Sequence, residues 1–168
     1  MKKIEYDPQK THYLVATAII VKDGKYLITQ RASHEKVWPN MWTVPGGKLN
    51  VNDYAKRKKD AGSELWYNVI EDLVHREVLE ETGLKIKNLG YVTSCAYFRP
   101  DGIPTLIISL CADWESGKVK LSKDMQDFAW VTLKEAKKYH LIDGIWEELE
   151  MLDKIRRGKK ARWRSPRS

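Results

Sequence analysis

The sequence lacks the features that mark a membrane protein or a small secreted domain. Its longest apolar run covers only residues 13–21, far short of the roughly 20 residues that a membrane helix requires. The same run is rich in β-branched residues and has no small-residue cleavage site near it, so it does not predict a signal peptide. The only two cysteines, Cys95 and Cys111, cannot form a disulfide framework, and no metal-binding spacing surrounds them. We therefore expect a protein of the reducing cytoplasm, in which both thiols lie in the core of strands.

Most of the chain also has no excess of positive charge. The 168 residues carry a formal net charge of +7, yet eight Lys or Arg and no acid lie within residues 154–168. The other 22 basic residues nearly balance the 23 acidic ones. This basic tail could follow a phosphate backbone, with Trp163 stacking on a base, or it could be a solubilising terminus. A composition of 42% hydrophobic and 32% charged residues is typical of a globular protein, and we expect one domain at residues 1–153 before the tail.

Alternating apolar runs and turn residues predict one mixed sheet with helices packed on its faces. Asp23-Gly24 lies between two β-branched runs, which predicts an antiparallel hairpin of residues 13–21 and 26–31. No internal repeat and no linker divides the chain. The other predicted strands are a short one at 42–44, which Pro45-Gly46-Gly47 ends, and strands at 89–98, 105–114 and 128–132; the predicted helices are 66–82, 134–139 and 142–156.

Three glutamates of the predicted helix at 66–82 lie on its apolar side, whereas a solvated acidic face would lie on the opposite side. At about 100° per residue, Glu77, Glu80 and Glu81 fall on the same arc as the apolar side chains. Carboxylates gathered at the edge of a core repel each other and lose hydration. Mg²⁺ or Mn²⁺ relieves this cost and prefers such oxygen ligands. The alternative is that Arg76, four residues before Glu80, neutralises part of a charged helix, which explains a single pair.

Residues 76–84, which read REVLEETGL, resemble the second half of the signature of the Nudix hydrolases at every position. The flanks agree, since residues 44–49 are similar to the strand and Gly-Gly turn that begin the signature. Residues 27–32 are similar to the strand before it, and residues 127–131 are similar to the closing segment of the family. The resemblance covers most of residues 13–140. It implies an α/β fold, namely an α/β/α sandwich with a mixed β-sheet. It also implies an enzyme that hydrolyses a nucleoside diphosphate linked to another group.

The resemblance also implies roles for individual residues. Glu80 and Glu81 match the glutamates that ligate Mg²⁺ or Mn²⁺, and Glu77 matches one that ligates the metal or acts as a base towards water. The remaining matches are the carbonyl of Gly46 as a metal ligand, Asp124 as an acid that completes the metal shell, Arg76 as a residue that orients the glutamates, and Arg31 as a contact of substrate phosphate. A bound metal would screen the pyrophosphate and lower the pKa of water, and a carboxylate would take up the proton of that water.

The first half of the signature departs from the family pattern. Twenty residues, 48–67, separate Gly47 from Asn68, where the signature has five residues and then a glutamate. Asp53 could supply the missing acid, or it could be a turn or N-cap residue. The insertion, at about residues 50–65, could be a specificity element, and its basic run at 56–59 could reach phosphates or be simply solvated. Because the later glutamates are intact, we expect activity to survive.

Aromatic residues near the expected site could stack a nucleotide base. We expect Trp38 and Phe98 to contact the substrate and Trp42 and Tyr97 to lie in the core, while His34 is a further candidate for substrate contact. The expected substrate is a small nucleotide, a dinucleotide or a nucleotide sugar. The alternatives are an RNA 5′-end processing enzyme that uses the basic tail, and a non-catalytic nucleotide-binding regulator, against which the three glutamates argue. A homodimer is also left open.

Overall fold

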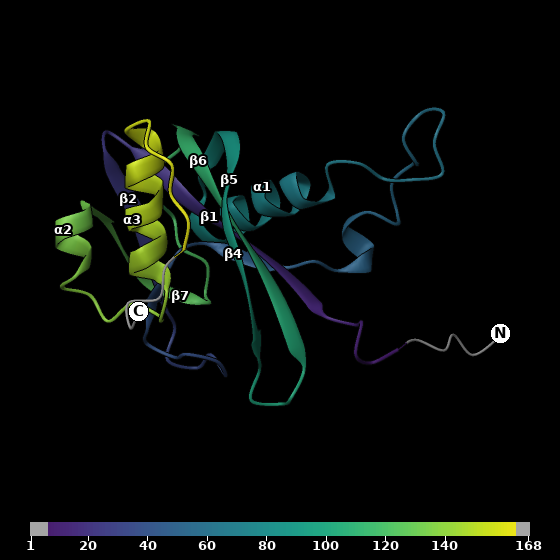
Figure 1. Cartoon of the computed structure of the whole chain (residues 1–168), viewed down its shortest axis with the longest axis horizontal. Coiled ribbons are helices and arrows are strands. Elements are labelled where there is room, and N and C mark those ends of the chain that lie inside the picture. The colour runs from purple at the N-terminus through teal and green to yellow at the C-terminus, as the bar shows by residue number, and fades with distance from the viewer. Residues whose placement is uncertain (1–6, 164–168) are drawn as a thin grey trace.

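A seven-stranded mixed β-sheet forms the centre of the structure, a computed structural model that describes residues 7–163 (Figure 1). The strand order is β3-β2-β1-β6-β5, with β4 paired to β1 and β7 paired to β2. The β1–β6 pair is parallel, and the other pairs between strands are antiparallel. The strands are β1 (Tyr13–Lys22), β2 (Lys25–Arg31), β3 (Trp42–Thr43), β4 (Gly46–Lys48), β5 (Lys85–Phe98), β6 (Pro104–Ser116) and β7 (Met125–Val131).

Helices cover both faces of this sheet, which confirms the predicted α/β/α sandwich. The helices are α1 (Val69–Thr82), α2 (Leu133–Ala136) and α3 (Ile145–Arg156), with a short 3₁₀ helix, η1, at Val51–Asp53. Successive side chains of β1 alternate between the faces, so Ala18 and Ile20 pack with α1 whereas Ile19 and Val21 pack with α3. Within residues 7–163, no helix is long and apolar enough to cross a membrane.

Two elements differ from the sequence-based expectation for reasons of backbone geometry. Helix α1 begins at Val69 rather than at residue 66, because Asn68 adopts a left-handed conformation with φ of 56°. Trp66 therefore lies outside the helix and packs against Tyr54, with ring centroids 5.4 Å apart. The short strand at 42–43 ends before Pro45, as expected, but Gly46 and Gly47 then pair with β1 as part of β4, a strand that was not expected there.

The two cysteines occupy different environments. Both lie on strands, as expected, but Cys95 is exposed and Cys111 is half-buried. The expectation of a core position is therefore wrong for Cys95. Strands β5 and β6 extend past the helices as a long hairpin (Figure 1), which leaves the outer part of β5 uncovered.

The inserted segment between β4 and α1 lies at one end of the molecule and folds mainly on itself (Figure 1). None of the residues of η1 is buried. Arg57 forms ion pairs with Asp60 and with Asp72 of α1, at 3.8 and 3.6 Å. The lysines of the basic run at 56–59 are exposed, and Lys59 pairs with Glu64 inside the same segment. The segment is thus held by polar contacts rather than by a core.

The basic tail turns back on α3. Gly158 has a φ of 73° and reverses the chain, and Ala161 then packs against the apolar cluster on the α3 face. Trp163 reaches the start of α3, where its ring lies near Gly144. Arg164 and Arg167, the last basic residues of the predicted tail, lie outside the described residues.

Candidate functional site

The last turns of α1 carry the three glutamates to the edge of the sheet. Leu73, Val74 and Val78 are buried against the sheet and fix the orientation of the helix. Glu77 and Glu81 are partly buried, but the side chain of Glu80 is 57% exposed. The expectation that all three glutamates continue the buried stripe is therefore wrong for Glu80, which lies at the solvent side of the arc.

Strand β4 brings two glycines against these glutamates. The backbone N–H of Gly46 donates a hydrogen bond of 3.0 Å to Oε2 of Glu81. Gly47 lies so close to Glu77 that an added Cβ would be 2.1 Å from its carboxylate carbon. Because no real Cβ contact is that short, a larger residue at this position would displace the carboxylate of Glu77.

Burial strongly disfavours negative charge on two of the glutamates. It raises the pKa of Glu81 to about 8; the hydrogen bond from Gly46 opposes the rise, as does the charge of Arg31, whereas the charges of Glu77 and Asp124 add to it. Burial also raises the pKa of Glu77, and the neighbouring Arg76 opposes this shift. Because it is costly to ionise such carboxylates together, a bound cation that offsets their negative charge is favoured. The oxygen donors of the site fit Mg²⁺ or Mn²⁺.

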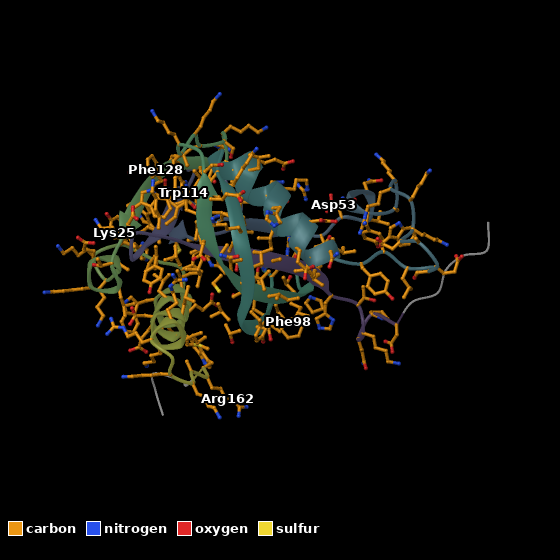
Figure 2. The ribbon with its side chains drawn as sticks, turned by 90° about the horizontal axis from the view of Figure 1, so that it is seen from above. Lys25, Asp53, Phe98, Trp114, Phe128 and Arg162 are labelled. Atoms are coloured by element: carbon orange, nitrogen blue, oxygen red, sulfur yellow. The ribbon has the colours of Figure 1, made fainter. Side chains whose placement is uncertain are left out.

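Arg76 connects the glutamates to the insertion. Its guanidinium lies 2.8 Å from Glu77, 2.8 Å from Glu80 and 3.3 Å from Asp53. Asp53 also accepts a hydrogen bond of 2.8 Å from the backbone of Asn50 and so closes a capping box for η1. Figure 2 shows Asp53 where the insertion meets α1. Asp53 thus caps a turn, as one interpretation expects, and it also contacts Arg76; its role as the missing acid of the signature stays a prediction.

A second group of titratable side chains lies in the loop after β2. His34, Glu35 and Asp124 offer atoms that lie within 4.8 Å of one another, and Nε2 of His34 is 3.7 Å from Asp124. Arg31 pairs with Glu35 and donates a hydrogen bond of 2.8 Å to the carbonyl of Val37. The pairing of β7 with β2 brings Asp124 to this loop. No sequence pattern had singled out Glu35, because it lies in an irregular segment.

The aromatic residues are arranged differently from the expectation. Trp38 packs against Tyr97, with ring centroids 5.2 Å apart and an interplanar angle of 33°. Tyr97 is only half-buried, so its predicted core position is wrong, whereas Trp42 is buried as predicted. Phe98 is 77% exposed and lies near the end of the long hairpin (Figure 2). Because successive strand residues point to opposite faces, Phe98 does not join Trp38.

Comparisons with known proteins agree with this geometry. The family model described as NUDIX domain matches residues 12–154. The NAD-capped RNA hydrolases NudC of Actinobacillus succinogenes and Mannheimia succiniciproducens are 39% and 36% identical to this chain over 129 residues, which are 72% of this chain and 41% of each relative. The chain thus spans about two fifths of the length of these curated relatives.

A solved structure shares the fold. The crystal structure of a MutT NUDIX hydrolase from Burkholderia pseudomallei superposes with a TM-score of 0.67, covering 85% of this chain and 99% of that one. The sequence identity of the pair is 20%, so the likeness supports the architecture alone.

Proposed function

This chain belongs to the Nudix hydrolase family, and we propose that it is a metal-dependent pyrophosphohydrolase that cleaves a nucleoside diphosphate linked to another group. The observation that carries the proposal is the meeting of Glu77, Glu80 and Glu81 with Gly46 and Gly47 at one edge of the sheet. A protein that only binds nucleotides has no need of three carboxylates beside the phosphates of its ligand. The arrangement therefore favours catalysis over a regulatory role.

The residues that would hold the metal are Glu77, Glu80, Glu81, the carbonyl of Gly46 and, from the loop before β7, Asp124. When bound, Mg²⁺ or Mn²⁺ supplies positive charge that screens the pyrophosphate and lowers the pKa of a water molecule. The N–H of Gly46 fixes Oε2 of Glu81 and leaves Oε1 available as a ligand. We assign uptake of the proton from water to the carboxylate of Glu77, whose pKa burial raises.

On the substrate side, we assign Arg31 to a phosphate and Trp38 to the base. The positive charge of Arg31 lowers the pKa of Glu81. The same charge would therefore attract a phosphate that lies near the metal. Trp38 offers an exposed ring that Tyr97 holds in place. Phe98 is left out of this assignment because it points to the other face. The cytoplasmic location and the homodimer stay predictions.

The test is a panel of substrates with Mg²⁺ or Mn²⁺: nucleoside triphosphates, dinucleoside polyphosphates, ADP-ribose, nucleotide sugars and capped RNA. Chromatography and mass spectrometry identify the products. We expect a nucleoside monophosphate or its equivalent from at least one class, and loss of turnover in Glu80→Gln. The matched control is Glu71→Gln, because Glu71 is an exposed carboxylate at the other end of the same helix. Unchanged turnover in Glu80→Gln would contradict the assignment.

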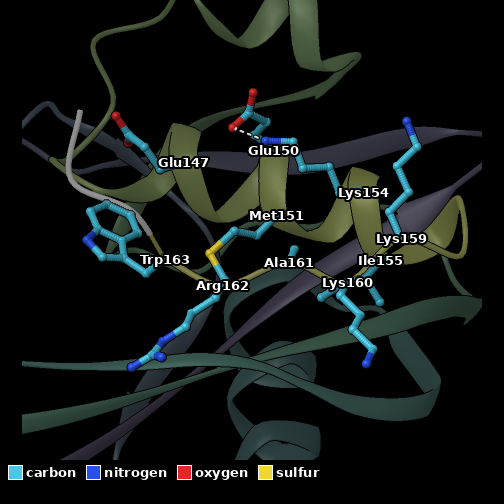
Figure 3. A pocket seen from close by; sticks show the side chains of 10 residues that line it. All are labelled: Glu147, Glu150, Met151, Lys154, Ile155, Lys159, Lys160, Ala161, Arg162 and Trp163. Atoms are coloured by element: carbon cyan, nitrogen blue, oxygen red, sulfur yellow. Dashed lines mark hydrogen bonds and ion pairs between the residues drawn. The ribbon is translucent and has the colours of Figure 1, made fainter. Parts of the chain in front are cut away.

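A second candidate, RNA 5′-end processing, is favoured by a groove between α3 and the tail (Figure 3). The groove encloses about 880 Å³, and its tail side carries Lys159, Lys160, Arg162 and the ring of Trp163. On the α3 side, Lys154 is paired with Glu150 at 2.8 Å. Positive side chains beside an aromatic ring can hold a single strand by its phosphates and bases. The NudC relatives are described as acting on NAD-capped RNA.

Charge removal at two places distinguishes the two candidates. In the RNA case, a triple alanine variant of Lys159, Lys160 and Arg162 should weaken turnover of capped RNA and lower the salt slope of binding by about two. A triple alanine variant of Lys56, Lys58 and Lys59 removes the same charge from the insertion and serves as the control. If both variants turn over RNA equally, or if RNA is not hydrolysed, the groove does not serve RNA.

A further inference from the structure

Glu148, in the first turn of α3, is a buried carboxylate. It lies on the face of the helix whose other side chains are apolar. It is 6% exposed, and within residues 7–163 its Oε2 has no hydrogen-bond partner. Ile145, Leu149 and Leu152, which share the same stripe of α3, are buried in the core. A buried carboxylate with an unsatisfied oxygen costs stability. Such a group in a folded protein calls for an explanation, and a bound ligand is one.

Glu148 acts on polar side chains of two strands, Ser109 of β6 and Cys95 of β5. Burial raises the pKa of Glu148, and a hydrogen bond from the Ser109 hydroxyl opposes the rise. Ser109 is itself fully buried and accepts a hydrogen bond of 3.4 Å from the hydroxyl of Thr17. Burial, followed by the charge of Glu148, raises the pKa of the exposed Cys95. The charge of Glu148 therefore acts on a side chain of β5 that is exposed.

The pairing of β4, β1 and β6 relates this carboxylate to the proposed metal site. Thr17 of β1 lies opposite Gly46 of β4 in the register of that pair, and opposite Ser109 of β6 on the other side. The N–H of Gly46 in turn holds Glu81. Neighbouring strands are about 4.8 Å apart, so the path from β4 to β6 covers about 10 Å. This separation suits an extended nucleotide with its phosphates at one end and its base at the other.

The aromatic pair lies on the same side of β5. Tyr97 follows Cys95 by two residues and so points to the same face, at a distance of about 7 Å along the strand. Its ring packs against Trp38, which is partly exposed. A base that stacks on this pair would lie on the face of β5 that also carries Cys95, the residue on which the charge of Glu148 acts. An apolar surface with one convergent polar group is typical of a small-molecule site.

We propose that Glu148 is a specificity-determining residue that recognises the base of the substrate nucleotide and selects bases with an exocyclic amino group. The proposal rests on the proposed function, because it supposes a nucleotide whose phosphates lie at Glu81. A carboxylate accepts hydrogen bonds from the amino groups of adenine, cytosine and guanine, and from guanine also the ring N–H. Uracil presents carbonyl oxygens in the place of the amino group, and the carboxylate repels them.

The experiment compares binding of AMP, CMP, GMP and UMP to the wild type and to Glu148→Met by titration calorimetry. The methionine side chain has a similar volume but does not accept hydrogen bonds as a carboxylate does. We expect wild type to prefer the amino-bearing nucleotides, and Glu148→Met to lose roughly 10- to 100-fold in affinity for them while UMP changes little. Glu71→Met makes the same change at an exposed site and should leave all four affinities unchanged.

The outcomes separate this proposal from the hydrolase assignment. Glu80→Gln tests catalysis, whereas base preference in binding does not require turnover. Equal binding of the four nucleotides by the wild type would overturn the subsite, as would equal losses for all four in Glu148→Met. If Glu148→Met does not fold, Glu148→Gln replaces it; the amide provides a single acceptor, so GMP should lose more affinity than UMP. Equal affinities for GMP in Glu148→Gln and wild type would also overturn the proposal.

Discussion

The two parts of the interrupted signature are built in different ways. Most of residues 76–84 lie on α1, which Val74 and Val78 anchor in the core. Residues 49–67 contain only the short helix η1, none of whose residues is buried. The two parts meet through the ion pairs Arg76–Asp53 and Arg57–Asp72. The side chains proposed for chemistry are therefore held by the packing of α1 against the sheet. We expect changes in the inserted segment to leave them in place, except where Asp53 contacts Arg76.

The largest effect is expected where β4 meets the anchored part. In Gly47→Ala, the new Cβ would collide with the carboxylate of Glu77. We expect turnover to fall by roughly 100-fold, since a displacement of about 1 Å in a catalytic group can cost that much. Steady-state kinetics on the substrate found in the panel measures the effect. The same change in the insertion, Gly62→Ala, places its Cβ in open space. Because Gly62 has a φ of 73°, the alanine strains the backbone there, but the strain is confined to the insertion and should leave turnover near that of the wild type.

An intermediate effect is expected at the contact between the two parts. Asp53→Ala removes the acid from Arg76, which then orients Glu77 and Glu80 less firmly. We expect turnover to fall by about tenfold, with little change in KM. This is the lower end of the losses seen when a residue that orients a metal ligand is removed. Asn50→Ala is the control, since it removes the capping box of η1 without touching Arg76. Equal losses in the two variants would mean that Asp53 only caps the turn.

The smallest effect is expected within the insertion. Arg57→Ala breaks ion pairs with Asp60 and Asp72, both of which are solvent-accessible. Such exposed pairs contribute about 0.2–1 kcal/mol each, so we expect faster hydrogen exchange at residues 50–68 and a change in turnover of less than about threefold. A loss as large as that of Gly47→Ala would show that the insertion takes part in catalysis.

Much of the fold was predictable because its elements carry strong local signals. The Asp23-Gly24 hairpin forms with the expected strands, and Gly83 ends α1 in a left-handed conformation as predicted. Strand β4 was missed because its pairing with β1 is long-range and its glycines have no strand propensity of their own. The start of α1 was missed because Trp66 falls on the apolar arc of the helical pattern, whereas its ring packs on Tyr54 of the insertion.

The site was predictable only where it follows a periodic pattern or the family signature. Glu77 and Glu81 were predicted from the helical periodicity of α1, which places them on its apolar side. The same reasoning would have identified Glu148, a carboxylate on the apolar face of α3. Glu35 and Tyr97 gave no such signal. Their neighbours, Asp124 and Trp38, come from distant segments that strand pairing and loop packing bring to them.

The most direct test of the central claim is Mn²⁺ binding, followed by electron paramagnetic resonance, because it asks whether the anchored glutamates hold a cation at all. We predict that wild type and Glu71→Gln bind Mn²⁺ alike and that Glu81→Gln loses most of this binding while keeping its fold by circular dichroism. Full Mn²⁺ binding in Glu81→Gln would contradict the claim that the carboxylates at the end of α1 form the metal site.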